Sequence, residues 1–189
     1  MGLRLIFLGP QGSGKGTQAS RLARLMGVPH VSTGVMLREA VAAGTELGKK
    51  ADAFMQAGDL VPDELVVAMV GERLSQDDAL CGYLLDGYPR NVSQAQALNE
   101  VLETPLDGLV QLDVPHEELM KRMLLRAQAE GRSDDTEEGI SRRLEIYWNE
   151  TAPLSDYYRD TGVAVYVVDG LGDIDEVFAR VALALAVEL

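Results

Sequence analysis

The 189-residue sequence has very little cysteine and no long apolar segment. Its single cysteine, Cys81, can form no disulfide within the chain and no zinc site made of several cysteines. Cys81 precedes an apolar run, so we expect a reduced and partly buried thiol. No apolar run approaches the ~20 residues of a membrane-spanning helix, and no secretory leader precedes the first expected strand. We therefore expect a cytoplasmic protein with no membrane partner.

Positive charge is also scarce. The chain has 17 Lys and Arg against 30 Asp and Glu, which gives a formal net charge of −13. Binding of nucleic acid depends on the neutralisation of its phosphates by basic residues, so this balance argues against a nucleic-acid partner. An anionic small molecule can still be bound if the few basic residues are gathered in one place.

Apolar runs and helical stretches alternate along most of the chain, with no repeat, low-complexity segment or Pro/Gly/Ser-rich linker. This alternation predicts a single α/β domain with a five-stranded parallel sheet and helices on both faces. The expected strands are 3–8, 28–31, 83–86, 109–114 and 163–168, and the expected helical stretches are 15–26, 62–76, 93–102, 115–129, 136–159 and 173–187. The segment 33–61 is expected to hold two short helices. In such sheets ligands bind beyond the carboxyl ends of the strands, here near Gly9, Thr33 and Asp86.

The stretch LIFLGPQGSGKGTQ, residues 5–18, joins the first strand to a helix through a loop rich in glycine. A backbone with few Cβ atoms can wrap closely around a ligand and point successive N–H groups into one concavity. The start of the helix adds the positive end of its dipole, and Lys15 adds a full charge. The spacing G-x-x-x-x-G-K in this setting predicts a phosphate-binding loop. Gly16 stands where most such loops carry the Ser or Thr that touches magnesium.

Several arginines lie near the expected strand ends, and this grouping is not what scattered surface arginines would give. They are Arg38, Arg90, Arg126, Arg132 and Arg143. Arginine forks bind phosphate oxygens in pairs and keep their charge in a dry site, so the set fits phosphoryl transfer between two polyphosphates. Asp86 ends an apolar strand beside the phosphate loop, and we expect it to hold Mg²⁺ or the waters of Mg²⁺.

Six motifs follow one another along nearly the whole chain: GPQGSGKGTQ, STGVMLR, GDLVPDELV, DGYPRNVSQA, EGRSDD and RRLEIYWNETAPLSDYY. Together they resemble the adenylate kinase family of nucleoside monophosphate kinases. The resemblance implies a three-layer P-loop fold and a monomer that reversibly converts MgATP and AMP into two ADP. It also implies an AMP-binding subdomain at 32–61 and a lid at 125–135. The lid resembles the short type, so no structural zinc is expected.

The resemblance also implies a role for each matching residue. The expected ATP-binding residues are Gly12, Ser13, Gly14, Lys15, Gly16, Thr17, Arg126 and Gly172. The expected AMP-binding residues are Thr33, Arg38, Asp59, Leu60, Val61, Gly87, Tyr88, Pro89, Arg90, Gln94, Arg132 and Arg143. The expected catalytic set is Lys15, Arg38, Arg90, Arg126, Arg132 and Arg143. Within it, Arg126 is expected to stack on the donor adenine, and Arg132 and Arg143 to straddle the phosphates.

Two positions concern magnesium, and of these only Val35 departs from the family pattern, because the family's GKGT loop carries the same glycine as Gly16. The family holds Mg²⁺ largely through water, so Gly16 is compatible with its chemistry. Val35 stands where the family usually has Asp in STGDMLR, which bears on the handling of Mg²⁺ rather than on the activity.

A uridylate/cytidylate kinase is the alternative within the same class. Thr33 argues against it, and so does Gln94, whose amide can pair with the N1 and N6 edge of adenine. Asn91 occurs in both kinds of enzyme, so the alternative stays open. A GTP-dependent switch protein would need a guanine-reading N-K-x-D, which the sequence lacks. A non-catalytic nucleotide-binding module would leave the arginines unexplained. The sequence does not distinguish ATP from GTP as donor.

Overall fold

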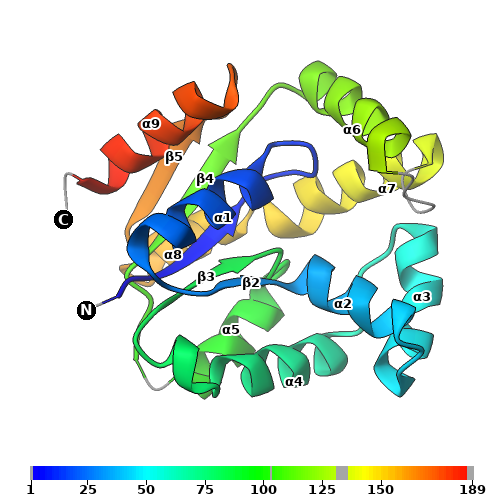
Figure 1. Ribbon diagram of the computed structural model, residues 1–189, viewed down its shortest axis with the longest axis horizontal. Helices are drawn as coiled ribbons and strands as arrows, with labels where there is room; N and C mark the ends of the chain where they lie inside the picture. The colour runs from blue at the N-terminus through cyan, green and yellow to red at the C-terminus, as the bar shows by residue number, and fades with distance from the viewer. Residues whose placement is uncertain (1, 103, 131–135, 187–189) are drawn as a thin grey trace.

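Five parallel strands form the centre of the protein (Figure 1). The structure is a computed structural model that describes residues 2–102, 104–130 and 136–186. The strands are β1 (Arg4–Leu8), β2 (His30–Ser32), β3 (Tyr83–Asp86), β4 (Gly108–Asp113) and β5 (Val165–Asp169), in the order β2-β3-β1-β4-β5. β1 is central, with Leu5 paired to Leu84 of β3 and Gly108 of β4. The prediction of a five-stranded parallel sheet is confirmed.

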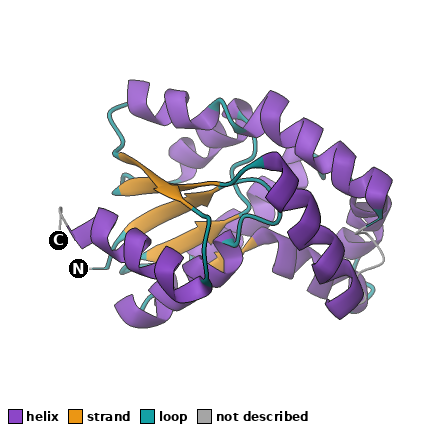
Figure 2. Cartoon of the chain, turned by 90° about the horizontal axis from the view of Figure 1, so that it is seen from above, coloured by secondary structure: helices purple, strands orange, loops and turns teal. Residues whose placement is uncertain are grey.

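Helices cover both faces of the sheet (Figure 2). The helices of the described residues are α1 (Lys15–Met26), α2 (Thr33–Ala42), α3 (Glu46–Ala57), α4 (Asp63–Leu74), α5 (Val92–Val101), α6 (His116–Glu130), α7 (Glu137–Ile146), α8 (Leu154–Asp160) and α9 (Ile174–Ala186), with a short 3₁₀ helix η1 (Asp77–Ala79). On one face α1 and α9 pack against Leu5 and Phe7 of β1. On the other face α4, α5 and α8 pack against Ile6 and Leu8. The strand β1 is apolar along its length because both of its faces are covered.

The amphipathic stretch expected at 136–159 is divided by a bend. α7 ends at Ile146, and a π-helical turn, η2 (Tyr147–Thr151), joins it to α8. The N–H of Ala152 donates to the carbonyl of Tyr147 at 2.8 Å, across five residues. Pro153 has no N–H with which to continue an α-helical ladder, which explains why the helix is interrupted here.

Cys81 is exposed, so the expectation of a partly buried thiol is wrong. It lies in the turn between η1 and β3, and the chain becomes buried again only after it, at Gly82 and the strand. None of the helices in the described ranges is both long and apolar enough to cross a membrane.

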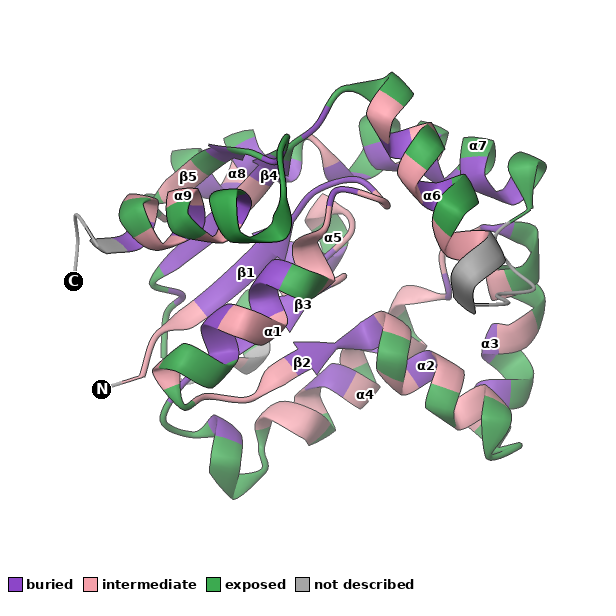
Figure 3. Cartoon of the chain, turned by 45° about the horizontal axis from the view of Figure 1, so that its top comes forward, coloured by how far each residue is buried: buried purple, intermediate pink, exposed green. Residues whose placement is uncertain are grey.

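Four helices project past the carboxyl ends of the strands and surround the region beyond those ends (Figure 3). Two of them, α2 and α3, correspond to the two short helices expected in the segment 33–61. The other two, α6 and α7, lie on the opposite side of the same opening. Side chains from both sides can therefore converge on the phosphate loop.

Candidate active site

Glycines shape the loop between β1 and α1. Gly12 and Gly14 have φ values of 84° and 88°, in the left-handed region that favours glycine. A Cβ on Gly12 would also lie 2.9 Å from the side chain of Met123. The loop leads directly into α1 at Lys15, so main-chain N–H groups and the positive end of the helix dipole meet in one place. This arrangement suits an anion.

Gly16 leaves room for the carboxylate of Asp86. A Cβ on Gly16 would lie 3.2 Å from Asp86 Oδ2, so a serine or threonine there would press on the carboxylate. Asp86 is 7% exposed, and its Oδ2 lies 3.3 Å from His30 Nε2. Burial raises the pKa of Asp86, but the hydrogen bond from His30 and the charge of Lys15 outweigh it and hold the pKa below its usual value. The carboxyl group is therefore an anion at neutral pH.

The positive charge of Lys15 is unfavourable in the free protein, because the ammonium group is buried and lies near other positive charges. Its Nζ donates to the carbonyl of Pro10 at 3.4 Å. Burial lowers the pKa of Lys15 to about 8; Asp86 raises it, whereas Arg90 and Arg126 lower it further. The ammonium group is still mostly protonated at pH 7. A polyphosphate beside it would compensate both its burial and its positive neighbours.

Five arginines surround a cavity of about 490 Å³ beyond the strand ends, which we call the arginine cavity. They are Arg38 of α2, Arg90 after β3, Arg122 and Arg126 of α6, and Arg143 of α7. Burial lowers the pKa of Arg90, with Arg143 and Arg38 adding to the effect. Among the described residues that line the cavity, Asp86 is the only carboxylate. The arginine cavity therefore favours a ligand of high negative charge.

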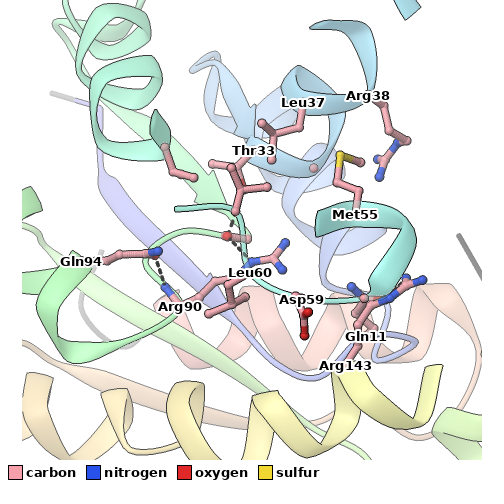
Figure 4. A pocket seen from close by; sticks show the side chains of 15 residues that line it. Gln11, Thr33, Leu37, Arg38, Met55, Asp59, Leu60, Arg90, Gln94 and Arg143 are labelled. Carbon is pink, nitrogen blue, oxygen red and sulfur yellow. Dashed lines mark hydrogen bonds between the residues drawn. The ribbon is translucent and has the colours of Figure 1, made fainter. Parts of the chain in front are cut away.

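A second cavity adjoins the first between α2, α3 and the turn after β3 (Figure 4); we call it the acceptor cavity. Its apolar side chains are Leu37, Met55, Leu60, Val61 and Val66. Figure 4 places Gln94 at the opposite end from Arg38 and Arg143. The hydroxyl of Thr33 donates to the carbonyl of Gly87 at 2.9 Å. An apolar space with one amide and several arginines suits a base attached to a phosphate.

A third cavity, of about 630 Å³, lies on the other side of the phosphate loop, and we call it the donor cavity. It shares Gly12, Gly14 and Thr17 with the arginine cavity. Arg122 also lines both, and its Nη1 donates to the carbonyl of Gly170 at 3.1 Å. Arg126 lines the arginine cavity but not the donor cavity. The three cavities thus form one continuous series with the cationic part in the middle.

The structure brings most of the predicted site residues to these cavities. All of the predicted ATP-binding residues line the arginine cavity or the donor cavity. Most of the predicted AMP-binding residues line the acceptor cavity, namely Thr33, Arg38, Asp59, Leu60, Val61, Gly87, Arg90, Gln94 and Arg143. Pro89 lines a neighbouring pocket under the phosphate loop. Tyr88 is 1% exposed, and its hydroxyl donates to the main-chain carbonyl of Gln94 at 3.2 Å, so its side chain supports α5.

Other lining residues were not foreseen. They include Gln11, Leu37, Met55, Val66 and Arg122. Gln11 Oε1 accepts a hydrogen bond of 2.8 Å from Arg143 Nη1, a contact across the cleft that no local pattern signals. Arg122 could have been found, because it lies one helical turn before Arg126 and so shares its face of α6. Arg132 and the lid residues 131–135 lie outside the described residues.

Comparison with known proteins gives one consistent result. A family model described as adenylate kinase matches residues 7–163. An adenylate kinase of Stenotrophomonas maltophilia (strain K279a) is 50% identical over 186 residues, which cover 97% of this chain and 99% of the relative. Adenylate kinases of Xanthomonas campestris pv. campestris (strain B100) and Xylella fastidiosa (strain M12) are 50% and 48% identical over the same shares. The chain belongs to the adenylate kinase family. These matches give no support to the uridylate/cytidylate kinase alternative.

Adenylate kinases are phosphotransferases that generally use ATP with Mg²⁺, and the residues here fit that ion. Mg²⁺ keeps several waters and is usually held by one or two carboxylates together with substrate phosphates. The described residues hold no group of three or more potential protein ligands, but such a group is not required. The ionised Asp86 faces the phosphate loop across Gly16. Val35, 43% exposed, lines the arginine cavity without adding a second carboxylate.

Proposed function

We propose that this adenylate kinase transfers the γ-phosphoryl group of MgATP to AMP, reversibly, and releases two ADP. The observation that carries the proposal is the series of three adjoining cavities, with one cavity on each side of a cationic centre. A protein that only binds ATP has no use for the acceptor cavity. Arg38, Arg90 and Arg143 line both the acceptor cavity and the arginine cavity, so two phosphate chains can meet there.

The donor nucleotide occupies the donor cavity and the phosphate loop in this proposal. The lining favours Arg122 beside the donor base, because Arg122 lines the donor cavity as well as the arginine cavity. Arg126, which we expected to stack on the adenine, is assigned to the phosphates, since it lines only the arginine cavity of the two. The backbone at Gly172, with a φ of 111°, borders the base.

The acceptor nucleotide occupies the acceptor cavity. Its base lies among Leu37, Val61 and Val66 with its polar edge at Gln94, and its phosphate lies toward Arg38 and Arg90. In the transfer, an oxygen of the AMP phosphate bonds to the γ-phosphorus as the bond from that phosphorus to the bridging oxygen of ATP breaks. No general base is needed, because the AMP phosphate is already an anion.

The protein contributes alignment and positive charge to this step. Lys15 lies at the start of α1, where it can follow the γ-phosphoryl group, and Arg90 and Arg143 neutralise the oxygens between donor and acceptor. Asp86 would hold Mg²⁺ through its waters, and the ion would supply further positive charge beside the phosphates. We also propose a monomer, as the resemblance to the family implies; elution as a dimer in size-exclusion chromatography would contradict it.

We also propose that the segments 32–61 and 125–135 close over the substrates. The first segment already contacts α7. Gly58 lies so close to this helix that a Cβ on it would come within 2.9 Å of the carbonyl oxygen of Gly139, and Arg142 Nε donates to Asp59 Oδ1 at 2.9 Å. The role of residues 131–135 stays a prediction. Hydrogen exchange at 131–135 should slow when a bisubstrate analogue binds, and equal exchange in both states would refute closure there.

The reaction itself is tested by incubating ATP and Mg²⁺ with each nucleoside monophosphate and separating the products. We expect two ADP for each ATP consumed with AMP. ATP consumption without an acceptor, or no product with any monophosphate, would refute the proposal.

A further inference from the structure

The amide of Gln94 is held from two sides. Its Nε2 donates to Asp63 Oδ1 at 2.6 Å, and its Oε1 accepts from the main-chain N–H of Arg90 at 2.8 Å. Gln94 is 2% exposed and lines the acceptor cavity, with the bond to Arg90 visible in Figure 4. Asp63 is the first residue of α4 and is not among the described residues that line that cavity.

The chemistry of the two partners decides which way the amide faces. An ionised carboxylate can only accept hydrogen bonds, so the NH₂ group must face Asp63. A main-chain N–H can only donate, so the oxygen must face Arg90. A rotation of the amide by 180° would set its oxygen against a carboxylate and its NH₂ against an N–H. Both contacts would then be repulsive.

The carboxylate is itself fixed in place. Ser93 Oγ donates to Asp63 Oδ2 at 2.7 Å, and Asn91 Nδ2 lies 3.5 Å from both oxygens. The positive end of the α4 dipole favours a negative charge at this position. Asn91 in turn accepts a bond from the main-chain N–H of Gln94 at 2.8 Å, so Asp63 and Gln94 are anchored to the same turn.

One hydrogen and one lone pair of the amide are left for a ligand, in a fixed order. Adenine presents an acceptor at N1 beside a donor at N6, which matches this order. Hypoxanthine and guanine present a donor at N1 beside an acceptor at O6, which is the reverse order. A freely rotating glutamine could read either edge, but the amide held by Asp63 and Arg90 can read only the first.

We propose that Asp63 is a specificity-determining positioning residue, which selects AMP against 6-oxopurine monophosphates by fixing the orientation of Gln94. The inference rests on the proposed function, in which Gln94 faces the acceptor base. Cytosine presents the same donor and acceptor order as adenine, so Asp63 does not separate AMP from CMP. That distinction falls to the size and lining of the acceptor cavity.

The test compares AMP with IMP as acceptors, because IMP differs from AMP only at the edge that Gln94 reads. In Asp63→Asn, the new amide can donate to the oxygen of a rotated Gln94. The orientation of Gln94 is then fixed only by the main-chain N–H of Arg90. We expect the ratio of kcat/KM for AMP to that for IMP to fall about tenfold, the factor that corresponds to ~1.4 kcal/mol. KM for ATP should not change, since Asp63 does not line the donor cavity.

Glu64→Gln is the matched control, because it removes the same charge from the same first turn of α4. Its AMP/IMP ratio should equal that of the wild type. An unchanged ratio in Asp63→Asn, or an equal change in Glu64→Gln, would overturn the role of Asp63. Should Asp63→Asn fail to fold, Asp63→Ser removes the carboxylate with a smaller side chain, and the same ratio decides. A wild-type protein that does not prefer AMP to IMP would instead refute the proposed function of Gln94.

Discussion

Replacement of Lys15 with Met should make the free protein more stable and almost inactive. The pKa of Lys15 is lowered from its ordinary 10.5 to about 8 by burial, which corresponds to roughly 3 kcal/mol of lost stability at neutral pH. The side chain is partly open to the cleft, so solvent screening reduces this figure. We expect a gain of about 1–2 kcal/mol in the free energy of unfolding at pH 7.

The sign of the pH dependence follows from the direction of the shift. Between pH 8 and 10.5 the unfolded chain binds more protons at Lys15 than the folded chain does, so the contribution of this residue to stability becomes more favourable as the pH rises. Below pH 8 both states are protonated and the full cost is present. The gain from Lys15→Met should therefore be largest at pH 7 and shrink toward pH 10.

Urea unfolding of the wild type and the variant at pH 7 and pH 9.5 measures this effect, with the fluorescence of Trp148, the single tryptophan, as the probe. Lys50→Met removes the same charge from an exposed position of α3 and should change neither stability nor activity appreciably. In Lys15→Met we also expect kcat to fall by about three orders of magnitude, because the charge acts most in the transition state. A variant less stable than the wild type at pH 7, or near-normal turnover, would refute the reasoning.

Two further changes test the two base sites. Thr33→Ala removes a hydroxyl that bonds to the Gly87 carbonyl at the acceptor cavity, and it should raise kcat/KM for CMP and UMP relative to AMP; an unchanged ratio would exclude Thr33 as a selector. Arg122→Ala should raise KM for ATP about tenfold or more with a smaller effect on KM for AMP. The same change in both KM values, or a larger ATP effect in Arg126→Ala than in Arg122→Ala, would contradict the assignment of Arg122 to the donor base.

Much of the fold and of the cleft could be predicted because the signals are local. The apolar residues of β1, the glycines of the loop and Lys15 lie within a few positions of one another, and α1 begins and ends where the pattern predicts. The rule that ligands bind beyond the carboxyl ends of parallel strands then selects Thr33 and Asp86 without any knowledge of the tertiary structure.

The remaining features depend on contacts between distant segments. The orientation of Gln94 depends on Asp63, 31 positions away in the chain, and no periodicity reports that contact. The reason for a glycine at position 16 becomes clear only in the structure, where the carboxylate of Asp86 lies beside it. The π-helical turn at Tyr147–Thr151 is hidden in the sequence, since its residues continue the polar and apolar pattern of a helix up to Pro153.

The central claim is that a cleft with two base sites exchanges a phosphoryl group between adenine nucleotides. Initial rates with MgATP and AMP, CMP, UMP or IMP, each at subsaturating concentration, test it most directly, with ADP formation followed by a coupled assay. The account predicts a kcat/KM for AMP about 100-fold or more above that for every other acceptor. A rate with CMP or UMP equal to that with AMP would contradict it.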